Sequence, residues 1–256
     1  MATTPRAGST GLGSYWEASR APRYSLLFAL PLLVLYQILA TLQPAGRQGS
    51  LRNGADVILE SLFIALAGRQ GPLLFMLCLI AGGLWLVARD MRRSGGGRRL
   101  RGTVFALMLA ESTALALGFG IAVAALTSQL VRPPAMLAPA QVETLGWWSR
   151  LMLSVGAGIY EELLFRVVLV AALAWIGHAV LGWRPAIAGV WATLLGAMLF
   201  SAAHYVGPYG DRLTLYSFVF RMIAGVFFSA LYLLRGFGIT AWTHALYDLF
   251  LFAAAP

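Results

Sequence analysis

The chain has 256 residues, of which 59% are hydrophobic and only 11% are charged. A soluble domain of this size carries roughly 25% charged residues, so the composition excludes an ordinary soluble fold and indicates a membrane protein. The 19 basic residues are all arginines and give a net charge of +9. The absence of lysine excludes a serine–lysine dyad and Schiff-base catalysis, and the single cysteine excludes an intrachain disulfide.

The first 23 residues are polar and rich in glycine and serine, and we expect them to form a disordered tail. The segments that follow reach the roughly 20 apolar residues that a helix needs to cross a bilayer. Six such segments are clear: residues 24–43, 72–88, 104–130, 185–203, 213–234 and 238–254. The sequence therefore predicts an all-α protein, a polytopic transmembrane helical bundle with one membrane domain over residues 24–256.

Residues 51–67 form a weaker apolar segment, because two acidic residues interrupt it. We favour an interfacial amphipathic helix here over a further span. Six arginines then lie in one short loop: Arg89, Arg92, Arg93, Arg98, Arg99 and Arg101. By the positive-inside rule we expect this loop on the cytoplasmic side of the inner (plasma) membrane, against anionic lipid headgroups. The clustering makes the lipid bilayer, and not nucleic acid, the expected partner.

The apolar block 147–181 is too long for one ordinary span and contains two adjacent carboxylates, Glu161 and Glu162. Charged groups at membrane depth are costly and usually functional. Glu162 lies four residues before Arg166, so the two share a helix face and can pair. Glu161 is turned about 100° away, toward another surface. We expect catalysis or proton handling at this pair, and a purely structural ion cluster is the alternative.

Two histidine motifs follow downstream. Phe200 precedes His204 by one helical turn at the end of a predicted span, so its ring can pack against the imidazole. His244 and Asp248 lie four residues apart inside the last span, so Asp248 can accept a hydrogen bond from His244. Each motif alone is compatible with a structural role, and their order and common location favour a shared site.

These three motifs, E-E-x-x-x-R, F-x-x-x-H and H-x-x-x-D, resemble those of the CAAX protease and bacteriocin-processing family, intramembrane glutamate proteases of the Rce1 (Abi) type. The resemblance covers about residues 147–254 and implies an Rce1-like core of about eight helices. It implies an intramembrane endopeptidase in which Glu161 and His204 activate a water molecule that attacks the scissile carbonyl. The implied substrate is a membrane-associated or lipidated peptide or protein.

The resemblance assigns roles to the other motif residues as well. His244 and Asp248 are expected to face the developing oxyanion. The supporting residues are Glu162, Arg166 and Phe200. Eukaryotic members of the family have asparagine where this chain has Asp248, and an aspartate donates a hydrogen bond only when protonated. Asp248 is therefore expected to orient His244, which would be the donor.

The motif positions also bear on topology. If residues 147–181 formed one helix, Glu161 would lie in the middle of the bilayer and His204 at one membrane face, so the two would not converge. We therefore expect the chain to break near Arg166 into two short spans, which places both residues toward the cytoplasmic side. No proline or glycine marks such a break.

Three alternatives remain open. A zinc ion held by Glu161, His204 and His244 would have two histidine ligands, one carboxylate and an open position, although the resemblance favours a mechanism without metal or other cofactor. A proton-coupled transporter would also carry glutamate and histidine within the membrane, but no internal repeat is visible. A non-enzymatic membrane scaffold or immunity protein of the same fold is the third alternative.

Overall fold

The computed structural model describes residues 12–43, 51–93, 100–133, 145–207 and 210–254, and within them every regular element is helical. The α-helices are α1 (Leu12–Arg20), α2 (Pro22–Leu42), α3 (Gly54–Ala67), α4 (Gly71–Arg93), α5 (Gly102–Leu130), α6 (Trp147–Gly156), α7 (Ala171–Trp175), α8 (Pro185–Ala203), α9 (Leu215–Arg235) and α10 (Phe237–Ala254). A short 3₁₀ turn, η1 (Gly68–Gln70), joins α3 to α4. This architecture confirms the prediction of an all-α helical bundle.

Six helical stretches in the described part of the chain are long and apolar enough to cross a membrane. Large hydrophobic side chains are exposed along their outer faces, which is the arrangement that lipid, and not water, tolerates. The chain is therefore an integral membrane protein. The expected span 238–254 forms α10 but is not among the six, because its polar residues, His244 and Asp248 above all, lower its hydropathy.

The composition of the first 23 residues predicts a disordered tail. The structure differs, because residues 12–20 form α1. Arg235 at the end of α9 donates a hydrogen bond to Ser19 at 3.0 Å, and its guanidinium lies 3.9 Å from the centroid of a Trp16 ring. The hydroxyl of Tyr15 donates to Glu111 in α5. These partners are distant in sequence, which is why composition alone missed α1; residues 1–11 lie outside the described part.

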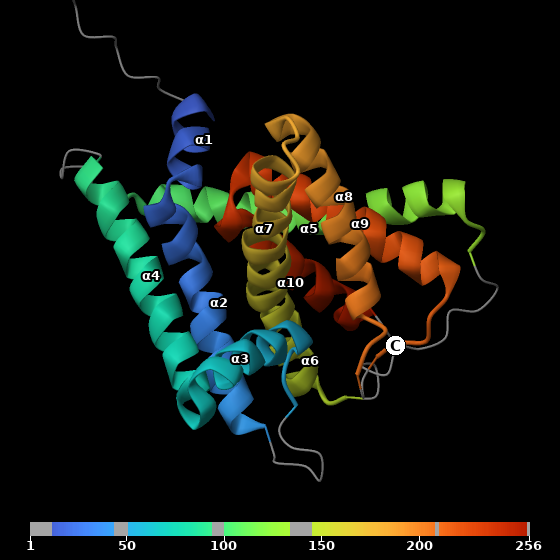
Figure 1. Ribbon diagram of the computed structural model, residues 1–256, viewed down its shortest axis with the longest axis horizontal. Coiled ribbons are helices and arrows are strands. Elements are labelled where there is room, and N and C mark those ends of the chain that lie inside the picture. The colour runs from blue at the N-terminus through green and yellow to red at the C-terminus, as the bar shows by residue number, and fades with distance from the viewer. Residues whose placement is uncertain (1–11, 44–50, 94–99, 134–144, 208–209, 255–256) are drawn as a thin grey trace, which may run out of the picture.

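Helix α3 lies across the ends of α2 and α4, which run alongside each other (Figure 1). Its first turn is capped by Asn53, whose side-chain oxygen accepts a hydrogen bond from the Ala55 amide at 2.9 Å. The interfacial placement expected for residues 51–67 stays a prediction. Three of the arginines expected in a loop, Arg89, Arg92 and Arg93, instead lie in the last turns of α4. Arg98 and Arg99 lie outside the described part of the chain.

The expected break near Arg166 is wrong, because the chain is helical without interruption from Trp147 to Val180. Instead of breaking, the backbone widens into π-helical turns, η3 (Ala157–Glu161), η4 (Leu163–Val170) and η5 (Ile176–Val180). Such turns are rare and often occur at functional sites. We call the whole stretch Trp147–Val180 the long helix.

The long helix and α8 form an antiparallel hairpin whose two arms stay in register. Near the turn Gly177 packs against Ala188, and twelve residues away on both arms Phe165 packs against Phe200, with ring centroids 5.1 Å apart. Four residues further on both arms, Glu161 faces His204. The two residues converge because they are equally far from the turn, and the first turns of the long helix simply extend beyond α8.

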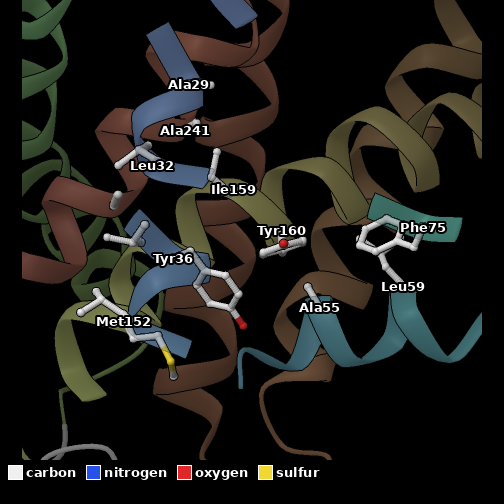
Figure 2. Packing of buried hydrophobic residues seen from close by; sticks show 13 residues of the cluster. Ala29, Leu32, Tyr36, Ala55, Leu59, Phe75, Met152, Ile159, Tyr160 and Ala241 are labelled. Atoms are coloured by element: carbon white, nitrogen blue, oxygen red, sulfur yellow. The ribbon is translucent and has the colours of Figure 1, made fainter. Parts of the chain in front are cut away.

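The largest buried cluster joins α2, α3, α4, α10 and the long helix (Figure 2). Tyr36 and Tyr160 lie at its centre with their ring centroids 4.9 Å apart, and both are fully buried. Beside them α10 crosses the long helix closely, because a Cβ atom on Gly158 would lie 2.3 Å from the carbonyl oxygen of Ala241. This close approach of small residues, common between membrane helices, brings α10 against the two glutamates.

Candidate active site

All seven residues singled out from the sequence meet in one connected cluster. The long helix supplies the two glutamates and the arginine, α8 and its C-terminal end supply Phe200 and His204, and α10 supplies His244 and Asp248. The hairpin register positions His204, and the close crossing at Gly158 positions His244. The cluster therefore depends on contacts between three helical segments.

Glu162 is fully buried and is shared between two cationic or proton-donating partners. Its Oε1 atom lies 3.2 Å from Nη1 of Arg166, as the four-residue spacing predicts. The same oxygen lies 2.6 Å from Nδ1 of His244. Because a carboxylate oxygen only accepts, Nδ1 carries the proton of this bond. Glu162 therefore ties the long helix to α10.

Arg166 is enclosed by aromatic rings as well as by its carboxylate. Its guanidinium carbon lies 4.4 Å from the ring centroid of Phe200 and 5.4 Å from that of Phe228. Rings facing a desolvated cation attract it through their negative π-faces. Phe228, in α9, was not predicted; its ring also stacks on His244 with centroids 4.3 Å apart. No motif marks it, because it is one apolar residue in an apolar helix.

Glu161 and His204 face each other across a short gap. The Oε2 atom of Glu161 lies 4.0 Å from Nε2 of His204, too far for a direct hydrogen bond. Nδ1 of His204 lies 2.8 Å from the carbonyl oxygen of Phe200, so Nδ1 donates and, in the neutral ring, Nε2 accepts. The Phe200 ring packs on the imidazole with centroids 4.8 Å apart, as predicted.

The other oxygen of Glu161 is held by a residue from the first half of the chain. Nδ2 of Asn53 donates to Oε1 of Glu161 at 2.9 Å. Oε2 has no hydrogen-bond partner among the described residues, although it is buried. The sequence carried only an indirect signal for Asn53, namely an Asn-Gly pair before an apolar helix, which marks a helix cap.

The expected hydrogen bond between His244 and Asp248 is absent. Nε2 of His244 lies 3.8 Å from Oδ2 of Asp248, beyond hydrogen-bonding distance, and Nδ1 is taken by Glu162. The helical spacing allowed a bond between His244 and Asp248. Glu162 on the long helix binds His244 instead, and both of these residues are buried. His244 therefore lies between two carboxylates, one bonded to it and one opposite its free nitrogen.

The zinc set considered above is not assembled in this arrangement. Among the residues that the structure describes, no group of three His, Cys, Asp or Glu side chains is placed to hold one metal ion. Glu161 and His204 of the proposed ligands face each other, while His244 directs Nδ1 to Glu162 and Nε2 toward Asp248.

Comparison with protein-family models matches residues 143–250 to the family described as Type II CAAX prenyl endopeptidase Rce1-like. This C-terminal segment of the chain is similar to that family. The match contains the two glutamates, both histidine motifs and Phe228, and it supports a protease of the CAAX type. Among the curated proteins and among the solved structures, no match was found.

The matched segment contains the seven-residue cluster but not every residue that contacts it. Asn53, together with α2 and α3, precedes the matched segment. The first half of the chain therefore contributes a direct contact to the glutamate that the sequence marks as the candidate base.

Proposed function

We propose that this protein is an intramembrane endopeptidase that hydrolyses peptide bonds of membrane-associated or lipidated substrates with a water molecule activated by Glu161 and His204. The observation that carries the proposal is the pair of acceptors, Oε2 and Nε2, that face each other at 4.0 Å. Glu161 lies against the buried centre of the bundle, while His204 is partly open to the outside.

Two facing acceptors suit a single water molecule. A water can donate a hydrogen bond of about 2.8 Å to each of two acceptors, and so bridges a gap of about this size. Its lone pairs then point away from both residues, toward an incoming carbonyl carbon. Protonation of either residue would remove an acceptor, so both must be unprotonated for the water to be held.

In the proposed reaction the water oxygen bonds to the scissile carbonyl carbon while its proton passes to Glu161. The carbonyl oxygen becomes an oxyanion, and Nε2 of His244, when protonated, is the donor toward it. Collapse of this intermediate breaks the carbon–nitrogen bond. The leaving amine takes the proton from Glu161, which restores the carboxylate. No metal ion and no other cofactor takes part.

Glu162, Arg166 and Asp248 act on His244 and not on the substrate. The bond from Nδ1 to Glu162 orients the imidazole, and Arg166 pairs with the same carboxylate oxygen. Asp248, opposite Nε2, stabilises a proton on that atom. In this role Asp248 does not need to donate a hydrogen bond. An asparagine at the same position could donate one.

The test is cleavage by the purified full-length protein in proteoliposomes, with peptides that carry prenylated or unmodified C-termini. Wild type should cleave at least one peptide, and Glu161→Ala and His204→Ala should each abolish cleavage. Cleavage that survives both substitutions would overturn the proposal. Proton flux without cleavage would favour a carrier, and loss of cleavage after exhaustive chelation, restored by zinc, would favour a metal mechanism.

A further inference from the structure

We propose that Asn53 is a positioning residue for Glu161 and that the N-terminal half of the chain thereby completes the active site. The proposal rests on the function proposed above. Asn53 lies outside the segment that matches the Rce1-like family, yet its amide contacts the candidate base directly, at 2.9 Å. No other described residue donates a hydrogen bond to Glu161.

The orientation of the Asn53 amide is determined by its surroundings. Its side-chain oxygen accepts from the Ala55 amide, which is a donor only. The nitrogen must therefore be the atom that faces Oε1 of Glu161, so the contact is a donor meeting an acceptor. Asn53 is buried, 5% exposed, so water does not compete for either contact.

The backbone of Asn53 is held as firmly as its side chain. Its amide donates to the hydroxyl of Tyr36 at 3.0 Å, and that hydroxyl donates to Oδ2 of Asp56 at 2.7 Å. Asp56 is fully buried and accepts from Nε of Arg52 at 2.7 Å. Figure 2 shows the Tyr36 ring reaching from α2 toward the start of α3. A chain of charge-assisted hydrogen bonds thus fixes the donor in place.

The consequence for Glu161 is that its two oxygens are not equivalent. Oε1 is occupied by Asn53, so Oε2 is the oxygen left to face His204. Without the amide, rotation about the last side-chain bond could direct either oxygen, or neither, toward the water. The donor also favours the ionised carboxylate, the form that accepts a proton.

Several charged groups influence Glu161 in addition to the neutral amide of Asn53, and they bear on any pH dependence. They are Glu162 and Arg166 on the long helix, His204 after α8, and His244 and Asp248 on α10. Substitutions at Asn53 leave all of these in place. A change in pH profile in an Asn53 variant therefore reports the amide contact.

The experiment compares three variants that separate capping from positioning. Asn53→Ser keeps a capping oxygen for α3 but is too short to reach Glu161. Asn53→Ala removes both the cap and the donor. Asn53→Asp keeps the cap and places a second carboxylate against Glu161.

We expect Asn53→Ser to keep a Tm near that of wild type while kcat falls about 10-fold or more with little change in KM. The acidic limb of its pH–rate profile should move to higher pH, because the carboxylate has lost a donor. Asn53→Ala should show the same kinetic defect with a lower Tm. Asn53→Asp should lose more activity than Asn53→Ser.

A wild-type kcat and pH profile in Asn53→Ser would overturn the proposal, and so would a defect that follows Tm across the three variants. Neither result would contradict the proposed function, which is tested independently by Glu161→Ala and His204→Ala. If those two variants keep cleaving, the proposed function fails whatever Asn53 does.

Discussion

The Nδ1 atom of His244 lies 2.6 Å from Oε1 of Glu162, so the last helix is joined to the long helix by the second glutamate of the pair. The two adjacent carboxylates thus have separate partners. Glu161 faces His204 and Asn53, while Glu162 faces His244 and Arg166.

Replacing one member of the buried pair Glu162 and Arg166 should lower the free energy of unfolding more than replacing both. Glu162→Gln leaves the guanidinium, 1% exposed, without its carboxylate, and should lower the free energy of unfolding by about 3–5 kcal/mol. The double variant Glu162→Gln/Arg166→Met should be less destabilised than Glu162→Gln alone. Denaturant unfolding in detergent micelles measures both, and additive losses would contradict the expectation.

Glu161 and His204 should act as one unit in catalysis. Glu161→Gln keeps an oxygen for the Asn53 donor and should preserve Tm, but it should lower kcat by about 10²–10⁴ because a general base is lost. His204→Gln should have a comparable effect. The double variant should be only slightly worse than either single variant, because residues that serve one step are not additive. Multiplied losses would show that the two act separately.

Gly158 should tolerate no larger side chain. A Cβ there would lie 2.3 Å from the carbonyl oxygen of Ala241, so Gly158→Ala should separate α10 from the long helix and cost about 1–3 kcal/mol. Activity should fall too, since α10 carries His244. The matched control is Gly118→Ala in α5, where nothing lies within 4 Å and alanine should be neutral or stabilising by up to about 1 kcal/mol. Equal Tm values for both variants would refute this.

The attachment of α1 should weaken only in strong alkali. Burial and the neighbouring carboxylate of Glu111 raise the pKa of Tyr15 above its ordinary value of 10.0. A raised pKa means that the contribution of Tyr15 to stability is complete below about pH 10 and falls as the pH rises further. The difference in Tm between wild type and Tyr15→Phe should therefore be constant from pH 7 to 9 and narrow toward pH 11. A difference that persists unchanged at pH 11 would contradict it.

Much of the fold and the site followed from the sequence, because apolar length and helical spacing are local properties. The spans, the pairing of Glu162 with Arg166 and the packing of Phe200 on His204 all depend on residues a few positions apart. The residues that escaped prediction depend on distant contacts. Asn53 reaches Glu161 from 108 positions away in the chain, and Phe228 is recognisable only once α9 is seen against α10.

The predicted break near Arg166 failed for a different reason. It assumed that a single helix over residues 147–181 must be centred in the bilayer, so that its middle and the end of the next helix lie at different depths. The structure instead matches the second part of the long helix to α8, residue against residue, from Gly177 and Ala188 to Phe165 and Phe200. The position of Glu161 relative to His204 is therefore set by contacts with the partner helix and not by the midpoint of a segment.

Because the two arms of this hairpin are matched residue by residue, the geometry of the site depends on the number of residues in each arm. Inserting or deleting one residue in either arm would turn every side chain beyond it by about 100° and shift it by about 1.5 Å along the helix, and so part Glu161 from His204. Lipid-facing residues of the same arms can be exchanged for other apolar residues at little cost. Evolution of this segment should therefore tolerate wide divergence in composition while conserving its length.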